Sequence, residues 1–264
     1  MGRLDDKIAI VVGAGQTPGQ TIGNGRATSI RFAEEGARVM LVDRDEMSAL
    51  ETLAMMRERG GEGSVFVADV TSEAECEAMI GACVDRYGRI DILHNNVGIG
   101  AGDRGAASVT EEVWDRIFTT NMKAVMFTCK HVLPIMREQG SGAITNISSV
   151  AAVCAVGLTA YKASKAALNA YTHALATGNA RYGIRANVIM PGLINTPMAI
   201  EGNVALGNDR DEVIARRDAQ VPLGAKMGTG WDVANAALFL ASDEAGFITG
   251  VCLPVDGGQA AKIG

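Results

Sequence analysis

Tyr161 and Lys165 are the residues of this chain whose types and spacing most directly suggest chemistry. They stand four residues apart, so on one helix both side chains project from the same face. A free tyrosine titrates near about 10, and a neighbouring ammonium favours the phenolate by charge attraction. Such a pair can donate or accept a proton near neutral pH. The spacing alone is weak evidence, because the same two residue types recur at this distance in many solvated helices.

The elements that must position this pair are indicated by seven short apolar segments, which alternate with stretches of helical spacing. Strands this continuously apolar are covered on both faces, and right-handed crossovers place the intervening helices there. We therefore expect an α/β fold, a single-domain doubly wound parallel seven-stranded sheet of the Rossmann type, spanning residues 1–264. The expected strands lie at 7–15, 38–45, 63–70, 89–96, 142–149, 184–192 and 250–258.

Composition argues against several classes of partner. The formal net charge is −6 and no cluster of Lys or Arg is interleaved with aromatics, which argues against nucleic acid and anionic membrane surfaces. No apolar run approaches membrane-spanning length, and the start of the chain lacks the basic flank of a signal peptide. The five cysteines and three histidines have no metal-ligand spacing. We expect a cytoplasmic protein with reduced thiols and no metal.

The residues of greatest chemical interest gather at the expected carboxyl ends of the strands, the edge at which doubly wound folds bind ligands. One stretch escapes the alternation of strands and helices. Residues 195–227 are mixed in charge and rich in small residues, and we interpret them as a mobile substrate lid. The strand-end residues are Gly13, Asp43, Asp69, Asn95, Ser149 and Pro191.

A glycine-rich turn follows the first expected strand and indicates a dinucleotide site. Its glycines allow the backbone to approach a pyrophosphate, which the amides at the start of the next helix would face. Asp43 ends the second strand, where a carboxylate can accept both ribose hydroxyls and repel a 2′-phosphate. We therefore favour NAD over NADP, although Arg44 could pair with a phosphate. Both acids also have an interpretation without a cofactor: Asp43 could be an exposed acid in a turn, and Asp69 could cap a helix.

Seven motifs in their order and approximate spacing resemble the short-chain dehydrogenase/reductase family over nearly the whole chain. The motifs are GNGRA, DILHNNVG, NMKAVMF, ITNISS, YKASK, YGIRAN and PGLINTPM. The resemblance implies that Tyr161 is the general acid/base and that Lys165 binds the nicotinamide ribose and lowers the pKa of the phenol. It also implies that Asn121 interrupts a helix and holds a water for proton relay.

The catalytic serine has two candidates. Alignment from the start of its strand selects Ser149, whereas the family's usual distance of thirteen residues to the tyrosine selects Ser148. Strand ends are better anchors than loops, so we choose Ser149 and keep Ser148 as the alternative. The serine would hydrogen-bond the substrate oxygen.

Further cofactor contacts follow from the same resemblance. One departure is clear: the family has three residues between the first two glycines of its motif, whereas nine separate Gly13 from Gly23 here. Asn24 and Gly25 should still open the helix. The remaining implied contacts are Asp69 and Val70 for adenine, Asn95, Asn96, Val97 and Gly98 for the adenosine side, and Pro191, Gly192, Ile194 and Thr196 for the nicotinamide.

These observations predict an oxidoreductase that transfers a hydride between NAD and a small-molecule secondary alcohol or ketone. One alternative is an NADPH-dependent reductase of ketones or 3-oxoacyl thioesters, which Arg44 would suit. A second is a non-catalytic dinucleotide sensor, against which the set of Asn121, Ser149, Tyr161 and Lys165 argues. The resemblance also implies a homo-oligomer, a tetramer or a dimer.

Overall fold

The structure is a computed structural model that describes residues 2–262. Its centre is one sheet of seven strands, all parallel, in the order β3-β2-β1-β4-β5-β6-β7. All seven expected strands and the doubly wound Rossmann-type fold are confirmed. The strands are β1 (Ile8–Val12), β2 (Arg38–Asp43), β3 (Glu62–Val67), β4 (Ile92–Asn95), β5 (Gly142–Ile147), β6 (Ile184–Pro191) and β7 (Cys252–Val255).

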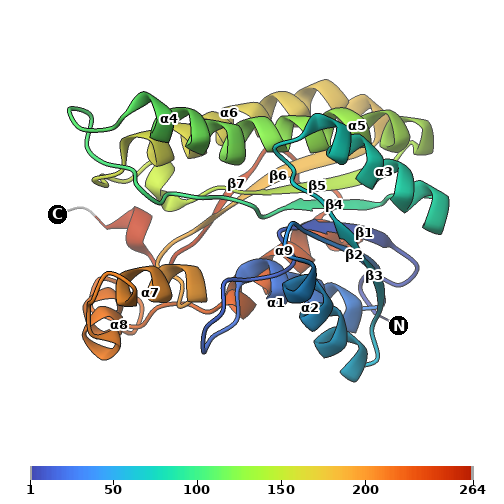
Figure 1. Cartoon of the computed structure of the whole chain (residues 1–264). Helices are drawn as coiled ribbons and strands as arrows, with labels where there is room; N and C mark the ends of the chain where they lie inside the picture. Colours follow the sequence, from blue (N-terminus) through green and yellow to red (C-terminus); the bar gives the residue numbers. More distant parts are fainter. Residues whose placement is uncertain (1, 263–264) are drawn as a thin grey trace.

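Helices cover both faces of the sheet. Figure 1 shows α3, α4, α5 and α6 on one side and α1, α2 and α9 on the other, with α7 and α8 apart at one end. The helices are α1 (Asn24–Glu34), α2 (Glu46–Glu58), α3 (Glu73–Tyr87), α4 (Glu111–Phe118), α5 (Ala124–Gln139), α6 (Thr159–Asn179), α7 (Pro197–Val204), α8 (Arg210–Asp218) and α9 (Gly230–Ala241).

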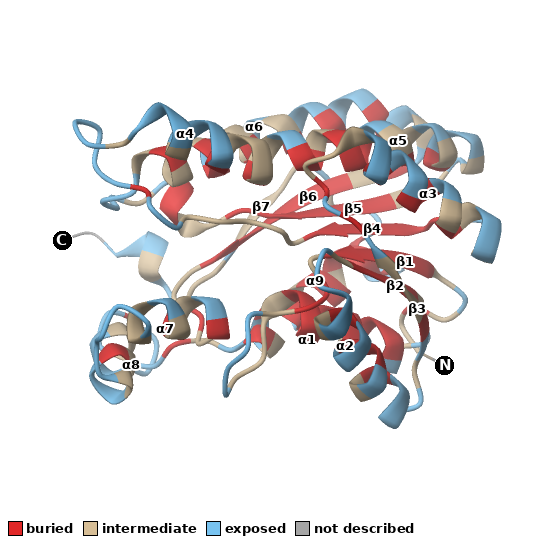
Figure 2. Cartoon of the chain, in the orientation of Figure 1, coloured by how far each residue is buried: buried red, intermediate tan, exposed pale blue. Residues whose placement is uncertain are grey.

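The alternation of side chains along each strand builds two apolar cores. Ile8, Ile10 and Val12 of β1 face one core, while Ala9 and Val11 face the other. Every residue of β1 is buried, and the strands form the buried centre of the molecule (Figure 2). Each fully buried Ile or Val side chain stabilises the fold by roughly 1.5 to 3 kcal/mol. This two-sided burial is why the strands could be recognised as continuous apolar runs.

A buried polar network ties the middle of the sheet to the helices above it. Asn95 of β4 donates to Asn146 of β5 at 2.9 Å and accepts from Thr128 of α5 at 2.9 Å. Asn146 in turn donates to Thr172 of α6 at 2.9 Å. Because buried amides and hydroxyls are costly unless paired, this chain of bonds fixes the two strands and two helices relative to one another.

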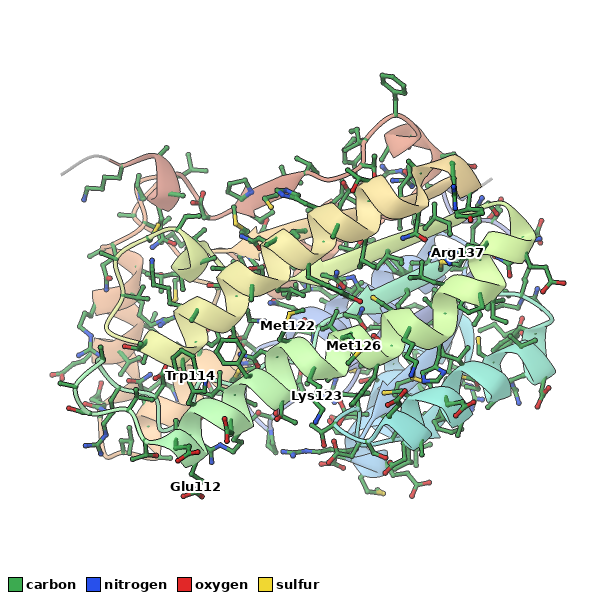
Figure 3. The ribbon with its side chains drawn as sticks, turned by 90° about the horizontal axis from the view of Figure 1, so that it is seen from above. Glu112, Trp114, Met122, Lys123, Met126 and Arg137 are labelled. Atoms are coloured by element: carbon green, nitrogen blue, oxygen red, sulfur yellow. The ribbon has the colours of Figure 1, made fainter. Side chains whose placement is uncertain are left out.

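A π-helical segment, Thr119–Lys123, separates α4 from α5, as the predicted interruption at Asn121 requires. The two helices continue through it as one rod over the sheet. Figure 3 looks down on this rod, along which the labels run from Glu112 and Trp114 to Arg137. Insertions of this kind displace the backbone hydrogen bonds of one turn, and they occur frequently at functional sites.

Residues 195–227 form the helices α7 and α8 with a small apolar core of their own. That core contains Ile200 of α7, Val213 of α8, and Val221 and Met227 beyond them. The segment is therefore structured rather than a plain loop, and its role as a lid stays a prediction. Within residues 2–262 no helix is both long enough and apolar enough to cross a membrane.

His94 of β4 is completely buried and packs edge-on against Phe32 of α1, with 6.0 Å between the ring centroids. Neither ring nitrogen has a hydrogen-bond partner among the described residues. Burial lowers the pKa of His94 to about 3. The histidine is thus a packed, neutral group, as expected for a structural rather than a cofactor-binding residue.

The burial of His94 predicts a loss of stability in mild acid. In the unfolded chain a histidine binds a proton below about pH 6.5, whereas folded His94 does not, so the free energy of unfolding should fall by about 2 kcal/mol between pH 7.5 and 5. Chemical unfolding of the His94→Leu variant at both pH values should show this component removed. The control is His173→Leu, which removes the same type of side chain from an exposed position on α6. Equal pH dependence in wild type and His94→Leu would contradict the assignment.

Candidate active site

Tyr161 and Lys165 lie one turn apart at the start of α6, on the same face, as predicted. The Lys165 Nζ is 5.8 Å from the centroid of the Tyr161 ring. The helix begins at Thr159, and its first amides are capped from a distant loop. The carboxylate of Asp103 accepts the Ala160 amide at 3.2 Å and the Tyr161 amide at 2.7 Å. Asp103 therefore fixes the turn that carries Tyr161 and complements the positive end of the helix.

Lys165 is an almost completely buried ammonium at the carboxyl end of β5. Its Nζ donates to the Ile147 carbonyl at 2.8 Å, and burial lowers its pKa to about 8. An added Cβ at Gly98 would lie 2.8 Å from the Nζ, so the absence of a side chain at Gly98 leaves room for the ammonium. The Ile147 carbonyl is its single hydrogen-bond partner within residues 2–262. Two of its three N–H donors are therefore available to a ligand.

The pKa of Tyr161 is raised by burial and lowered in part by a hydrogen bond with Ser149. The expected depression of this pKa by Lys165 is wrong for the free protein, because burial of the phenol is the larger effect. Its depression when a cofactor is also bound stays a prediction. In the free protein the phenol is the favoured state near neutral pH.

The two candidate serines have different environments. Ser149 is half-buried and accepts the Ala151 amide at 3.1 Å, and its hydroxyl lies close enough to Tyr161 to lower the pKa of that phenol. Ser148 is buried, and its hydroxyl donates to the Lys165 carbonyl at 2.9 Å, which ties the end of β5 to α6. The geometry thus supports Ser149 as the hydroxyl beside the phenol and gives Ser148 a structural part.

Asn121 is completely buried within the π-helical segment, and its side chain is fully engaged. The Oδ1 accepts the Ile99 amide at 2.7 Å, while the Nδ2 donates to the Ile99 carbonyl at 2.9 Å and to Ser164 at 3.0 Å. The side chain thus clamps the loop after β4 against α6. Because both N–H groups of Nδ2 are used, the predicted water would be held by the second lone pair of Oδ1 or by the main chain.

The glycine-rich turn after β1 is built for close approach of a ligand. Gly13 has a positive φ of 78°, and a Cβ at Gly25 would lie only 1.9 Å from the Gly13 carbonyl oxygen. Asn96 donates to that same carbonyl at 3.1 Å, and Val97 packs beside it. Gly23 supplies no side-chain cap to α1, and the first turn of α1, which includes Asn24, has no acid. These amides suit a pyrophosphate.

Asp43 lies at the end of β2 with its carboxylate directed by main-chain amides. One oxygen accepts the Gly15 amide at 2.9 Å and the other accepts the Asp45 amide at 3.1 Å. Asp69 instead accepts the amide and hydroxyl of Thr71, which are the main causes that lower its pKa; attraction from the nearby Arg44 adds to them. The cap of α3 is Ser72, so Asp69 is a turn residue rather than that helix cap.

Two residues predicted to contact the cofactor, Asn95 and Val70, have side chains that are buried in the interior of the protein. The Asn95 side chain belongs to the buried network with Asn146, and Val70 is buried in the core beneath α3. Any contact of either residue with a cofactor would have to come from its main chain. The residue that reaches the glycine turn is Asn96.

The predicted nicotinamide turn follows β6. Pro191 is the buried last residue of β6, and the Gly192 amide donates to the Val255 carbonyl at 3.0 Å. Ile194 is buried and pairs with Gly228, while Thr196 precedes the first turn of α7. The turn therefore joins the sheet edge to the start of the segment interpreted as a lid.

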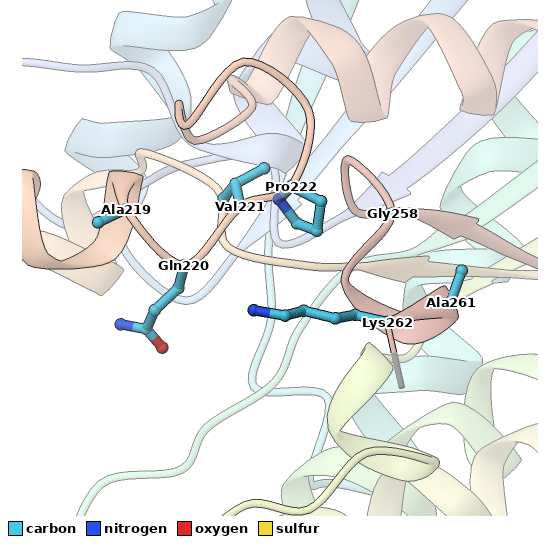
Figure 4. Close-up of a pocket in the computed structure, with 7 residues that line it drawn as sticks. All are labelled: Ala219, Gln220, Val221, Pro222, Gly258, Ala261 and Lys262. Atoms are coloured by element: carbon cyan, nitrogen blue, oxygen red, sulfur yellow. The ribbon is translucent and has the colours of Figure 1, made fainter. Parts of the chain in front are cut away.

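A groove of about 400 Å³ lies between the end of that segment and the C-terminal part of the chain (Figure 4). Ala219 to Pro222 form one wall, and Gly258, Ala261 and Lys262 form the other. None of these residues belongs to the predicted catalytic or cofactor set. The groove therefore shares no lining residue with the candidate active site around Tyr161.

Several residues that organise the site were not predicted from the sequence. Asp103 stands in an irregular loop, and nothing in its neighbourhood indicates that it caps a helix 58 residues away. Lys162 donates to the carbonyls of Ala151 and Cys154, which fixes the loop after Ser149 against α6. Such contacts arise from the tertiary fold and leave no local pattern.

Known proteins are similar to this chain over nearly its whole length, which includes all the residues of the site. A family model described as enoyl-(acyl carrier protein) reductase matches residues 19–260. The chain is 35% identical to levodione reductase of Leifsonia aquatica, over 98% of this chain and 96% of that protein. It is 37% identical to 2,5-dichloro-2,5-cyclohexadiene-1,4-diol dehydrogenase of Sphingobium indicum, over 99% of each. The crystal structure of a short-chain dehydrogenase/reductase from Burkholderia xenovorans is similar with a TM-score of 0.96, 41% identity and 100% of each chain covered.

The Asp103 cap predicts that turnover depends on a residue remote from the reacting atoms. Asp103→Ala leaves two helix amides unpaired, so we expect a loss of about 1 to 2 kcal/mol in stability and a fall in kcat. Asp103→Asn keeps one acceptor oxygen and should recover part of both. Ser72→Ala removes a cap of the same kind from α3 and should reduce stability without the fall in kcat. Equal kcat values in Asp103→Ala and wild type would contradict the positioning role.

Proposed function

Because the chain belongs to the short-chain dehydrogenase/reductase family and is an NAD(P)-dependent oxidoreductase acting on CH–OH groups, we propose that it transfers a hydride between NAD and an apolar secondary alcohol or ketone. The observation that carries the proposal is that Ser149, Tyr161 and the buried Lys165 lie together at the carboxyl edge of the sheet. A protein that only sensed a dinucleotide would not need this arrangement.

The residues present fit a dinucleotide. The uncapped start of α1 and the crowded Gly13 and Gly25 would receive the pyrophosphate, and the two free donors of Lys165 would hold the nicotinamide ribose. The turn from Gly192 to Thr196 would hold the nicotinamide amide group. When bound, the nicotinamide supplies or accepts the hydride.

Proton transfer is the work of the chain itself. In oxidation, Tyr161 as phenolate would take the proton of the substrate hydroxyl while Ser149 holds the oxygen. The carbinol carbon loses a hydride as its bond to oxygen becomes a carbonyl. In reduction, the Tyr161 phenol gives its proton to the oxygen, and each step runs backwards. Because burial raises the pKa of Tyr161, oxidation should rise toward alkaline pH and reduction should be favoured near neutrality.

NAD is the proposed cofactor because Asp43 is fixed where the adenosine ribose would bind. Its two oxygens are aimed by the amides of Gly15 and Asp45 and retain lone pairs for ribose hydroxyls. A 2′-phosphate at that place would meet a fixed negative charge.

The substrate is proposed to be uncharged and largely apolar. The loop from Ser149 to Tyr161 has no charged residue, and it exposes Val153, Val156 and Leu158 beside α6. Met198, on the first turn of α7, is 61% exposed. Relatives named for levodione and for a cyclohexadiene-diol act on a dione and a diol, in keeping with such a substrate.

A homo-oligomer is also proposed. Phe247 is fully exposed on the described surface and Trp114 is partly exposed. Association of copies would remove such apolar side chains from water.

The proposed function predicts that the Tyr161 and Ser149 hydroxyls are needed for turnover and not for cofactor binding. Tyr161→Phe and Ser149→Ala should each lower kcat by about a hundredfold or more, because proton transfer or oxygen positioning is lost. NADH binding, followed by nicotinamide fluorescence, should remain. Ser148→Ala removes a neighbouring hydroxyl that bonds only to main chain, and it should turn over within a few-fold of wild type.

Near-normal turnover in Tyr161→Phe would exclude the mechanism. The substrate panel should consist of uncharged cyclic ketones and secondary alcohols, each assayed with NADH or NAD and with the NADP forms. Higher kcat/KM with the NADP forms would contradict the proposed role of Asp43.

A further inference from the structure

The nine residues between Gly13 and Gly23 form a loop that is held by its own hydrogen bonds. The side chain of Gln16 closes its base, because its Oε1 accepts the Gly23 amide at 2.8 Å and its Nε2 donates to the Thr21 carbonyl at 3.2 Å. We call residues 16–22 the extended loop. Its six residues beyond the family spacing are therefore held in a defined conformation.

The base of the extended loop is anchored to α2. The Gln16 amide donates to the Ser48 hydroxyl at 2.8 Å, and that hydroxyl donates to the Gln16 carbonyl at 3.0 Å. Arg26 of α1 donates to the Ser48 carbonyl at 3.1 Å and is itself almost completely buried. The loop is thus fixed to the elements that form the pyrophosphate turn.

The tip of the extended loop lies against α7, toward which it descends in Figure 1. A Cβ placed on Gly19 would be 2.8 Å from the Glu201 Oε1 and 2.9 Å from the Pro197 Cβ, so the main chain packs directly on the helix. The nearby Gln20 amide makes a small contribution to lowering the pKa of Glu201. Arg210 of α8 forms an ion pair with the same carboxylate.

Glu201 therefore joins three segments: the extended loop, α7 and α8. The Arg210 hydrogen bond is the main cause that lowers the pKa of Glu201, so the carboxylate stays charged at neutral pH. The contact between the extended loop and Glu201 connects the glycine turn after β1 with α7. These are the two ends of the proposed cofactor site.

We propose that the extended loop is a latch in which Glu201 is a positioning residue, holding α7 and α8 over the bound dinucleotide and slowing its release. This proposal rests on the proposed function, since it requires that the chain bind NADH. The latch acts on release of the cofactor rather than on the hydride step, because Glu201 is held between Gly19 and Arg210 and forms no hydrogen bond with Tyr161 within residues 2–262. It gives the six additional residues a function specific to this chain.

The test is the rate of NADH release, measured by stopped-flow fluorescence as excess NAD displaces it. Glu201→Ala removes the side chain that lies between the loop tip at Gly19 and Arg210, and dissociation should become about tenfold faster. Glu201→Gln keeps a side chain of the same size with an acceptor oxygen and should recover most of the slow release. Glu212→Ala removes an exposed acid from α8 and should release NADH at the wild-type rate.

Two further readouts separate a latch from general loosening. Hydrogen exchange at residues 17–22 should be faster in Glu201→Ala, while the thermal midpoint of the free protein stays within the range of the Glu212→Ala control. The single-turnover hydride rate at saturating cofactor should be unchanged. Wild-type release in Glu201→Ala would overturn the latch alone. Failure of the wild-type protein to bind NADH would overturn the proposed function and the latch with it.

Discussion

The burial of one ammonium group, that of Lys165, is the constraint on which the site depends. A charge removed from water needs partners, and here the Ile147 carbonyl at the end of β5 supplies one at 2.8 Å. That bond fixes α6 against the sheet edge and requires a residue without a side chain at Gly98. It also leaves two N–H donors directed at nothing in the described chain. The fold thus maintains a desolvated cation with unused donors, which is a suitable arrangement for binding sugar hydroxyls.

The surrounding hydrogen bonds fix the position of the Lys165 ammonium relative to the Tyr161 phenol. The buried network of Asn95, Asn146 and Thr172 couples β4 and β5 to α6. Asp103 caps the turn that carries Tyr161. Asn121 binds the loop that contains Gly98 and Ile99. Each of these groups is polar, buried and paired, so the loss of one partner would leave another unsatisfied. Precision at the site is therefore obtained from buried hydrogen bonds more than from apolar packing.

Much of the fold and part of the site could be predicted from the sequence, because two periodicities govern them. Continuous apolar runs mark strands covered on both faces, and a spacing of four places Tyr161 and Lys165 on one helical face. Counting from the strand also selects Ser149, which lies beside the phenol. Asp103 and Glu201 could not be predicted, since their partners lie in segments that only the tertiary fold brings close. The direction of the Tyr161 pKa was missed because it is set by burial of the phenol, which spacing along the chain does not report.

The most direct test of this account is the pKa of Tyr161, measured by ultraviolet difference titration of wild type against Tyr161→Phe. In the free protein we expect a value above the ordinary tyrosine pKa of about 10, because burial outweighs the Ser149 bond. With saturating NAD, the pyridinium charge should lower it by about one unit or more. A Tyr161 pKa at or below the ordinary value in the free protein would contradict the dominance of burial. A Tyr161 pKa that does not change with NAD would contradict the claim that this phenol lies beside the nicotinamide as the proton-transfer group.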